Sequence, residues 1–84
     1  MDTSKFKALL DDRHQWPCEY TFKFVVPADK EDELAAFFEA SETIKKNSKT
    51  GKFISFTIVR LMNSSDEVIE VYTKVSEVEG VVSL

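Results

Sequence analysis

The most reactive side chains of the sequence are those of His14 and Cys18, which lie four positions apart in a polar segment. Imidazole and thiolate both bind metals, but a closed zinc site needs about four such ligands, and the sequence has no further His or Cys. His14 would activate a nucleophile such as Ser48 only if the fold brought the two together, and no orienting third residue or glycine-rich phosphate loop is evident. The sequence therefore predicts no catalytic residue, no metal ligand and no cofactor, and Cys18 is expected to be a small buried hydrophobe.

A candidate interaction surface is predicted instead on a β-hairpin and on the sheet face that the hairpin would share with a neighbouring strand. Its members are polar, basic or aromatic: Lys23, Ser48, Lys49, Lys52, Phe53, Ser55 and Thr57. Such a face can bind an anionic ligand, an acidic partner protein or a second copy of the chain. The alternative is that the lysines only prevent aggregation between sheet edges, and that the Ser and Thr residues form the solvated half of a strand.

Phe53 is the most informative residue of this surface, because strand alternation directs a large apolar ring away from the core. An exposed aromatic side chain beside lysines often marks a contact surface. The alternative is that the N-terminal segment folds across the sheet and covers Phe53 with Phe6 or Trp16.

The hairpin that positions the surface is predicted over residues 43–62. Residues 53–59 are mostly β-branched or aromatic, which favours a strand. Gly51 follows a polar run and suits a turn that needs positive φ, so we expect a strand over 43–49, a turn about Thr50–Gly51, and a second strand. Alternation places Phe53, Ser55 and Thr57 on one face of that strand, and on the other, core side Ile54, Phe56 and Ile58.

The residues before the hairpin predict two helices and a strand. Ser4 is expected to cap a short helix over residues 5–11, and Trp16 to pin this lead-in segment to the core. Residues 20–26 alternate like a strand with one buried face. Asp29 is expected to cap a helix that runs to about Ala40.

The residues after the hairpin predict a helix and a short strand. Ser64 and Glu67 have the spacing of a capping box, and valines follow at helical intervals as far as Val78. Gly80 suits the position just past a helix end, and residues 81–84 suit a final strand.

This order of elements predicts an α+β protein with the ferredoxin-like βαββαβ architecture, in which a four-stranded antiparallel sheet carries two helices on one face. The first and third strands are central in that fold, so strands 43–49 and 81–84 are expected at the two edges. We expect a lead-in segment over residues 1–18 and a single ferredoxin-like domain over residues 19–84.

Composition and charge limit the classes of partner. The 84 residues are 43% hydrophobic and 31% charged with a net charge of −4, as in ordinary globular proteins. The hairpin is locally basic, because no acid occurs between Glu42 and Asp66, but the overall negative charge disfavours nucleic acid. RRM domains share the expected architecture, yet Ser55 stands where a second outward aromatic is needed to stack RNA bases.

The sequence also predicts a cytoplasmic, soluble protein with no membrane partner. The one cysteine excludes an internal disulfide. The apolar run at residues 8–10 is too short for a signal-peptide core or a membrane span.

Several local motifs resemble one known family. They are Leu9–Leu10 before Trp16–Pro17, the run Tyr20, Thr21, Phe22 and Lys23, then Ser48, Gly51, Phe53, Ser55 and Thr57 around the hairpin, and Val68, Val71 and Tyr72 on the second helix. In these motifs the chain resembles the YbeD-like proteins, an uncharacterised bacterial family. Two positions depart from its pattern: Thr50 replaces the usual lysine before the turn glycine, and Trp16 replaces a phenylalanine.

The resemblance implies a ferredoxin-like fold similar to regulatory ACT domains, and it implies no established reaction. The expected function is therefore a non-catalytic binding or regulatory module that acts through self-association or a protein partner. A homodimer formed by pairing the edge strand at residues 81–84 is a second hypothesis, and a small-molecule sensor is a third. An ACT-type ligand site would lie at residues 26–29, where the absence of glycine makes close approach of a ligand less favourable.

Overall fold

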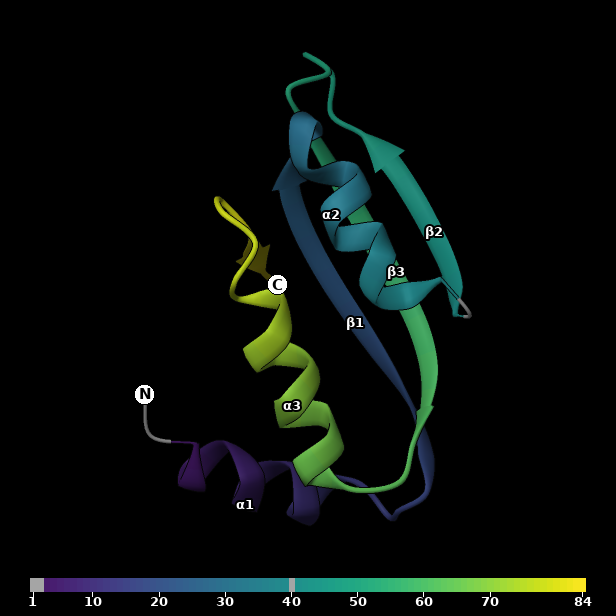
Figure 1. Ribbon diagram of the computed structural model, residues 1–84. Coiled ribbons are helices and arrows are strands. Elements are labelled where there is room, and N and C mark those ends of the chain that lie inside the picture. Colours follow the sequence, from purple (N-terminus) through teal and green to yellow (C-terminus); the bar gives the residue numbers. More distant parts are fainter. Residues whose placement is uncertain (1–2, 40) are drawn as a thin grey trace.

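The computed structural model describes residues 3–39 and 41–84, and two of its helices cover one face of a curved antiparallel sheet (Figure 1). The N-terminal helix lies across the lower end of this arrangement in the view of Figure 1. The elements in chain order are α1 (Ser4–Arg13), β1 (Cys18–Pro27), η1 (Ala28–Lys30), α2 (Glu31–Ala35), η2 (Ala36–Phe38), β2 (Glu42–Asn47), β3 (Phe53–Met62), α3 (Ser65–Val75) and β4 (Val82–Ser83).

The sheet has the strand order β2-β3-β1-β4, with every neighbouring pair antiparallel. The first and third strands are therefore central, as predicted, and the ferredoxin-like α+β fold is confirmed. β1 and β3 pair along their whole length, from Cys18 opposite Met62 to Pro27 opposite Phe53. The two edge strands are shorter than the central ones: β2 spans Glu42–Asn47 and β4 only Val82–Ser83.

The hairpin between β2 and β3 turns where the sequence predicts it. Gly51 has a φ of 74°, a conformation in which a side chain would be strained. The backbone N–H of Ser48 donates to the Phe53 carbonyl at 2.9 Å, and the Gly51 N–H donates to the Ser48 carbonyl at 3.1 Å. The expected strand at 43–49 is shifted to Glu42–Asn47, because Ser48 and Lys49 already belong to the turn region.

The helix between β1 and β2 differs from the prediction. It is a short α-helical turn flanked by 3-10 turns, and no side chain caps the start of either η1 or α2. The prediction that Asp29 is an N-cap is therefore wrong, since Asp29 lies within η1. The Ala28 N–H donates to the Lys52 carbonyl at 2.8 Å, and this bond ties the end of β1 to the hairpin before the helix begins. The expected helix end at Ala40 lies outside the described residues.

Helix α3 begins as the capping-box spacing predicts. The Ser64 side chain accepts a hydrogen bond from the Glu67 N–H at 3.2 Å, while Glu67 Oε1 accepts from the Asn63 N–H at 3.2 Å. The carboxylate thus reaches one residue further back than in the standard box. Helix α1 differs from the prediction that Ser4 caps it. Ser4 is the first residue of the helix, and Thr3 occupies the N-cap position without a capping bond from its side chain.

The core lies between the helix-bearing face of the sheet and α2, η2 and α3. Its buried side chains are Phe22, Phe24 and Val26 of β1, Ile54, Phe56, Ile58 and Met62 of β3, Leu34 and Phe38 of α2 and η2, Val68 and Val75 of α3, with Leu10 and Val78. Among the described residues, no helix has both the length and the apolar character needed to cross a membrane.

Candidate functional site

The sheet face opposite α2 and α3, here called the outer face, carries the alternate residues of each strand. On β3 these are the neighbours of buried Phe56 and Ile58, and the strand register then assigns the other strands. The members of the outer face are Glu19, Thr21, Lys23 and Val25 of β1, Glu42, Ile44 and Lys46 of β2, Phe53, Ser55, Thr57, Val59 and Leu61 of β3, and Val82 of β4.

The outer face exposes large apolar side chains from three strands. Ile44 is 65% exposed, Phe53 46%, Leu61 62% and Val82 53%. On the inner face of β3 the corresponding side chains of Ile54, Phe56 and Ile58 are buried. This face is therefore the candidate interaction surface, because exposed apolar residues are common singly but less so as several on one sheet face.

The lead-in segment does not cover the outer face. Helix α1 packs beside α3, where Lys7 Nζ lies 2.8 Å from Ser65 Oγ and 3.2 Å from an Asp66 carboxylate oxygen. The Phe6 ring meets the Tyr72 ring edge-on at 5.5 Å between centroids. The alternative that Phe6 or Trp16 covers Phe53 is therefore wrong. Trp16 instead packs against the core, as predicted, and its indole Nε1 donates to Asp11 at 3.0 Å.

The predicted surface residues fall into two groups. Lys23, Phe53, Ser55 and Thr57 share the outer face, whereas Ser48, Lys49 and Lys52 belong to the hairpin turn. Two of the hydroxyls are used within the fold: Ser48 Oγ accepts from the Phe53 N–H at 3.2 Å, and Ser55 Oγ donates to the Lys46 carbonyl at 3.3 Å. Lys49 and Lys52 are exposed, and no described carboxylate forms an ion pair with either.

The charges of the outer face separate along the strands. Lys46 lies opposite Ser55, on the side of the hairpin turn, with Lys49 and Lys52 beyond it. Glu42 lies opposite Val59 and Glu19 opposite Leu61, at the far end of the same strands. The face therefore has a basic end near Phe53 and an acidic end near Leu61.

The alternation of β3 predicts only part of this face. Leu61 continues the alternation that begins at Phe53, so its outward direction was accessible from the pattern of β3. The outward direction of the Ile44 and Val82 side chains cannot be predicted from the pattern of their own strands. It depends on the pairing of Ile44 with Thr57 and of Val82 with Val25.

His14 and Cys18 lie together at the opposite end of the sheet from the hairpin turn. The Cys18 Sγ and His14 Nδ1 atoms are 3.7 Å apart, and the His14 ring lies 5.4 Å from the rings of both Trp16 and Tyr20. Within the described part of the chain, no group of three or more candidate ligands forms a metal site. Ser48 lies beyond the Phe53 end of β3, whereas Cys18 pairs with Met62 at the other end, about 30 Å away along ten-residue strands. The two do not form a nucleophile–base pair.

The titrating groups with shifted pKa values lie on the helix side. A hydrogen bond with Asp66 raises the pKa of Lys7, while hydrogen bonds with Ser65 and Trp16 lower the pKa of Asp11. Burial raises the pKa of Tyr72, and the Tyr20 hydroxyl at 3.3 Å adds to this shift. All three of these groups lie at the junction of α1, α3 and the start of β1.

The loop at residues 26–29, where an ACT-type ligand site was considered, is packed against the C-terminal segment. A Cβ atom placed on Gly80 would lie 2.8 Å from Pro27 Cγ, so the backbone at Gly80 already occupies the space beside this loop. Gly80 has a φ of 81°.

Comparison with known proteins identifies the family without adding a function. No curated protein and no solved structure matches the chain. The family model described as "Protein of unknown function (DUF493)" matches residues 11–84, and this confirms the resemblance to the YbeD-like proteins. The chain belongs to the DUF493 family.

Proposed function

We propose that this protein is a non-catalytic, cytoplasmic binding module that associates with a second copy of itself through the outer face, and that regulation acts on this association. The observation that carries the proposal is that Ile44, Phe53, Leu61 and Val82 are all exposed on one sheet face that no described segment covers. Burial of such side chains from water drives association.

The charge separation favours one symmetric arrangement of the two copies. A two-fold axis that runs across the strands places the basic end of one outer face over the acidic end of the other. An axis along the strands would place like ends together, which repulsion opposes. The row formed by Ile44, Thr57 and Lys23 lies midway between the two ends, so the axis is expected to follow this row.

This arrangement has a specific set of contacts. Ile44 packs near its own symmetry mate, and Lys46 of one copy faces Glu42 of the other, because both lie two residues from Ile44 on β2. Phe53 faces Leu61 in the same way, since both lie four residues from Thr57 on β3. Lys23 lies on the axial row and opposes association, since its two copies approach each other with like charge.

The area of the face sets the expected affinity. Strands of ten residues are about 33 Å long and spaced about 4.8 Å apart, which gives roughly 500 Å² for this sheet, less than the roughly 800 Å² per partner of a standard interface. We therefore expect a dissociation constant on the order of 10 μM or weaker.

Sedimentation velocity over a range of protein concentrations at low ionic strength tests the proposal. The wild type is expected to shift from monomer to dimer as concentration rises, and Ile44→Lys to remain monomeric. The matched control is Leu9→Lys, because Leu9 is an exposed leucine on α1, away from the outer face. A wild type that stays monomeric at every concentration, or an equal effect of the two substitutions, would overturn the proposal.

The edge-strand dimer is the competing arrangement, and the structure gives it less support. β4 pairs with β1 through only two residues, so its free edge provides few backbone groups for a second chain. Such a dimer would tolerate Ile44→Lys, because Ile44 lies on β2 at the other edge of the sheet.

A further inference from the structure

One arginine occupies the helix-bearing face of the sheet. On β3 the inner positions are Ile54, Phe56, Ile58, Arg60 and Met62, and all of these except Arg60 are buried. Arg60 follows Ile58 toward the C-terminal end of the strand, where its side chain is exposed. A cation at a position otherwise used for packing requires a specific explanation.

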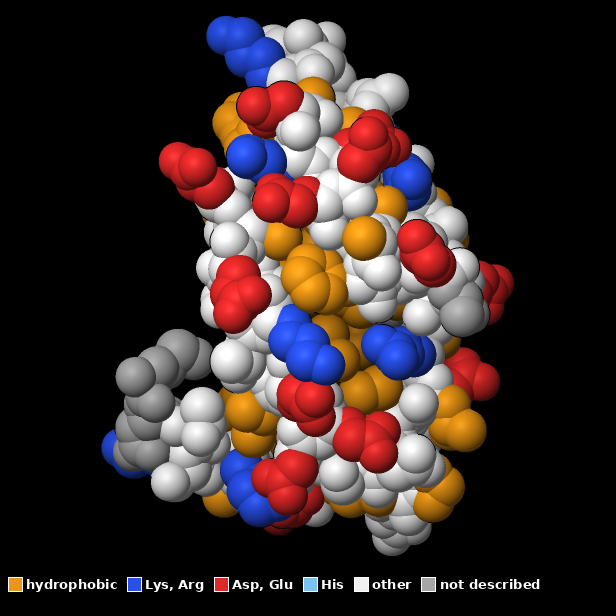
Figure 2. All heavy atoms as spheres, in the orientation of Figure 1, with side chains coloured by type: hydrophobic (Ala, Val, Ile, Leu, Met, Phe, Trp, Pro, Cys, Tyr) orange, Lys and Arg blue, Asp and Glu red, His pale blue; other side chains and the backbone are white. Residues whose placement is uncertain are grey.

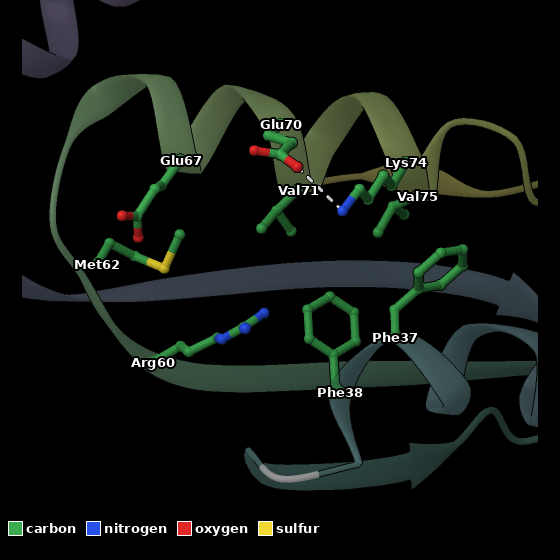
Figure 3. Close-up of a pocket in the computed structure, with 9 residues that line it drawn as sticks. All are labelled: Phe37, Phe38, Arg60, Met62, Glu67, Glu70, Val71, Lys74 and Val75. Atoms are coloured by element: carbon green, nitrogen blue, oxygen red, sulfur yellow. Dashed lines mark ion pairs between the residues drawn. The ribbon is translucent and has the colours of Figure 1, made fainter.

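A groove lies at this place, between η2, β3 and α3. Its volume is about 220 Å³, and it is lined by Phe37, Phe38, Arg60, Met62, Glu67, Glu70, Val71, Lys74 and Val75. Figure 3 shows Arg60 reaching in from β3 and Lys74 from α3, with the Phe38 ring beside them. On the surface in Figure 2, lysine or arginine side chains border apolar side chains between the two helices.

The acids of the groove are already engaged. Glu70 pairs with Lys74 at 3.0 Å, and Glu67 accepts the Asn63 N–H at 3.2 Å. Arg60 forms no ion pair or side-chain hydrogen bond with any other described residue. Because Lys74 is paired, the guanidinium of Arg60 is the cation of the groove that is free to bind an anionic ligand.

We propose that this groove binds a small organic carboxylate that carries an apolar group. The planar guanidinium of Arg60 matches a carboxylate through two parallel hydrogen bonds. The apolar group would lie against Phe37, Phe38 and Val75, which line the groove. The groove is smaller than the roughly 300–1,000 Å³ of sites for drug-sized ligands, so the ligand is a small metabolite with one compact side group. Its site lies on the opposite side of the sheet from the outer face and is independent of self-association.

Titration of the ¹⁵N-labelled protein with phenylacetate, followed by two-dimensional NMR, tests this site. We expect saturable shifts in the amides of Val71, Lys74 and Val75 and in the Arg60 side chain, with an affinity on the order of 1 mM. Arg60→Gln keeps a polar side chain but shortens it and removes its charge, and it is expected to weaken binding by about tenfold or more. Lys5→Gln is the matched control, because Lys5 is an exposed cation on α1, away from both the groove and the outer face.

Two further probes separate the chemistry of the ligand. 2-Phenylethanol keeps the ring without the charge, and inorganic phosphate keeps the charge without the ring, so both are expected to bind more weakly than phenylacetate. The proposal is overturned if phenylacetate gives no saturable shift, if Arg60→Gln leaves its affinity unchanged while remaining folded, or if phosphate binds as well as phenylacetate. The last result would mean that Arg60 acts only as a surface cation.

Discussion

The two faces of this sheet are built from the same strands but differ in how they are covered. On β3, Phe56 on the inner face is 1% exposed, while Phe53 on the outer face is 46% exposed. The inner face is covered by α2, η2 and α3, and the outer face by none of the described residues. The comparison shows that the alternate residues of one strand divide between a packed core and an uncovered surface.

The two faces also differ in how their charged residues are arranged. On the outer face the charges separate into a basic and an acidic end, an arrangement suited to a symmetric partner. On the helix side the lysines form ion pairs within the chain, Lys45 with Glu31 at 3.2 Å and Lys74 with Glu70 at 3.0 Å. The arginine of the inner face, Arg60, departs from this pattern and marks the groove proposed as a ligand site.

The largest expected difference between the faces is in stability. Phe56→Ala is expected to lower the free energy of unfolding by about 3–5 kcal/mol, because it leaves a cavity among buried side chains. Phe53→Ala is expected to lower it by less than about 1 kcal/mol, since that ring is half in water. Urea unfolding at a concentration where the protein is monomeric measures both. Similar losses for the two variants would contradict the assignment of inner and outer faces.

The second-largest expected effect is on dimerisation through the outer face. Leu61→Ser is expected to weaken dimerisation about tenfold, or about 1.4 kcal/mol, because in the proposed dimer Leu61 packs against Phe53 of the second copy. The same substitution at Leu10, a buried core residue, should instead reduce stability. Sedimentation equilibrium together with thermal unfolding separates the two outcomes. A Leu61→Ser variant with unchanged association would remove Leu61 from the interface.

A smaller effect is expected at the helix that covers the inner face. Ser64→Ala removes the hydrogen bond to the Glu67 N–H and is expected to cost about 1 kcal/mol. Thr3→Ala is the matched control, because Thr3 occupies the N-cap position of α1 without a capping bond from its side chain, and its cost is expected to stay within about 0.5 kcal/mol. Chemical denaturation of both variants checks this, and equal costs would contradict the capping geometry.

The smallest effect concerns pH and the junction that keeps α1 on the helix side. The pKa of Asp11 is lowered by hydrogen bonds with Ser65 and Trp16, so the folded state binds this proton less tightly than the unfolded chain. The resulting stability is present above the unfolded pKa near 3.8 and is lost as pH falls through the lower folded value. Unfolding midpoints of wild type and Asp11→Asn should therefore converge as the pH falls well below the unfolded pKa near 3.8. A constant difference at all pH values would contradict this role.

Much of the fold could be predicted because local and long-range signals agree. Gly51 and the alternation that follows it predict both the turn and the inner face of β3, and Ser64 with Glu67 predicts the start of α3. The helix after β1 was predicted less well. Asp29 has the chemistry of a cap, but the Ala28 N–H already bonds to Lys52 across the sheet, and this long-range contact is absent from the local pattern.

The candidate site could be predicted only for the strand that shows clear alternation. Phe53 was identified as an outward aromatic residue, whereas Ile44 and Val82 were not, because the outward direction of an edge-strand residue depends on its pairing partner. The groove at Arg60 was also missed. Its lining comes from η2, β3 and α3, and no short motif reports that these three elements meet.

A charge-swap cycle between Glu42 and Lys46 tests the central claim most directly. Sedimentation velocity at low ionic strength would compare the dissociation constants of the dimers formed by wild type, Glu42→Lys, Lys46→Glu and the double variant. In the proposed dimer each single change places like charges opposite each other and is expected to weaken association about tenfold, while the double variant restores wild-type affinity. Additive weakening in the double variant, or no effect of any change, would contradict a two-fold dimer formed through the outer face.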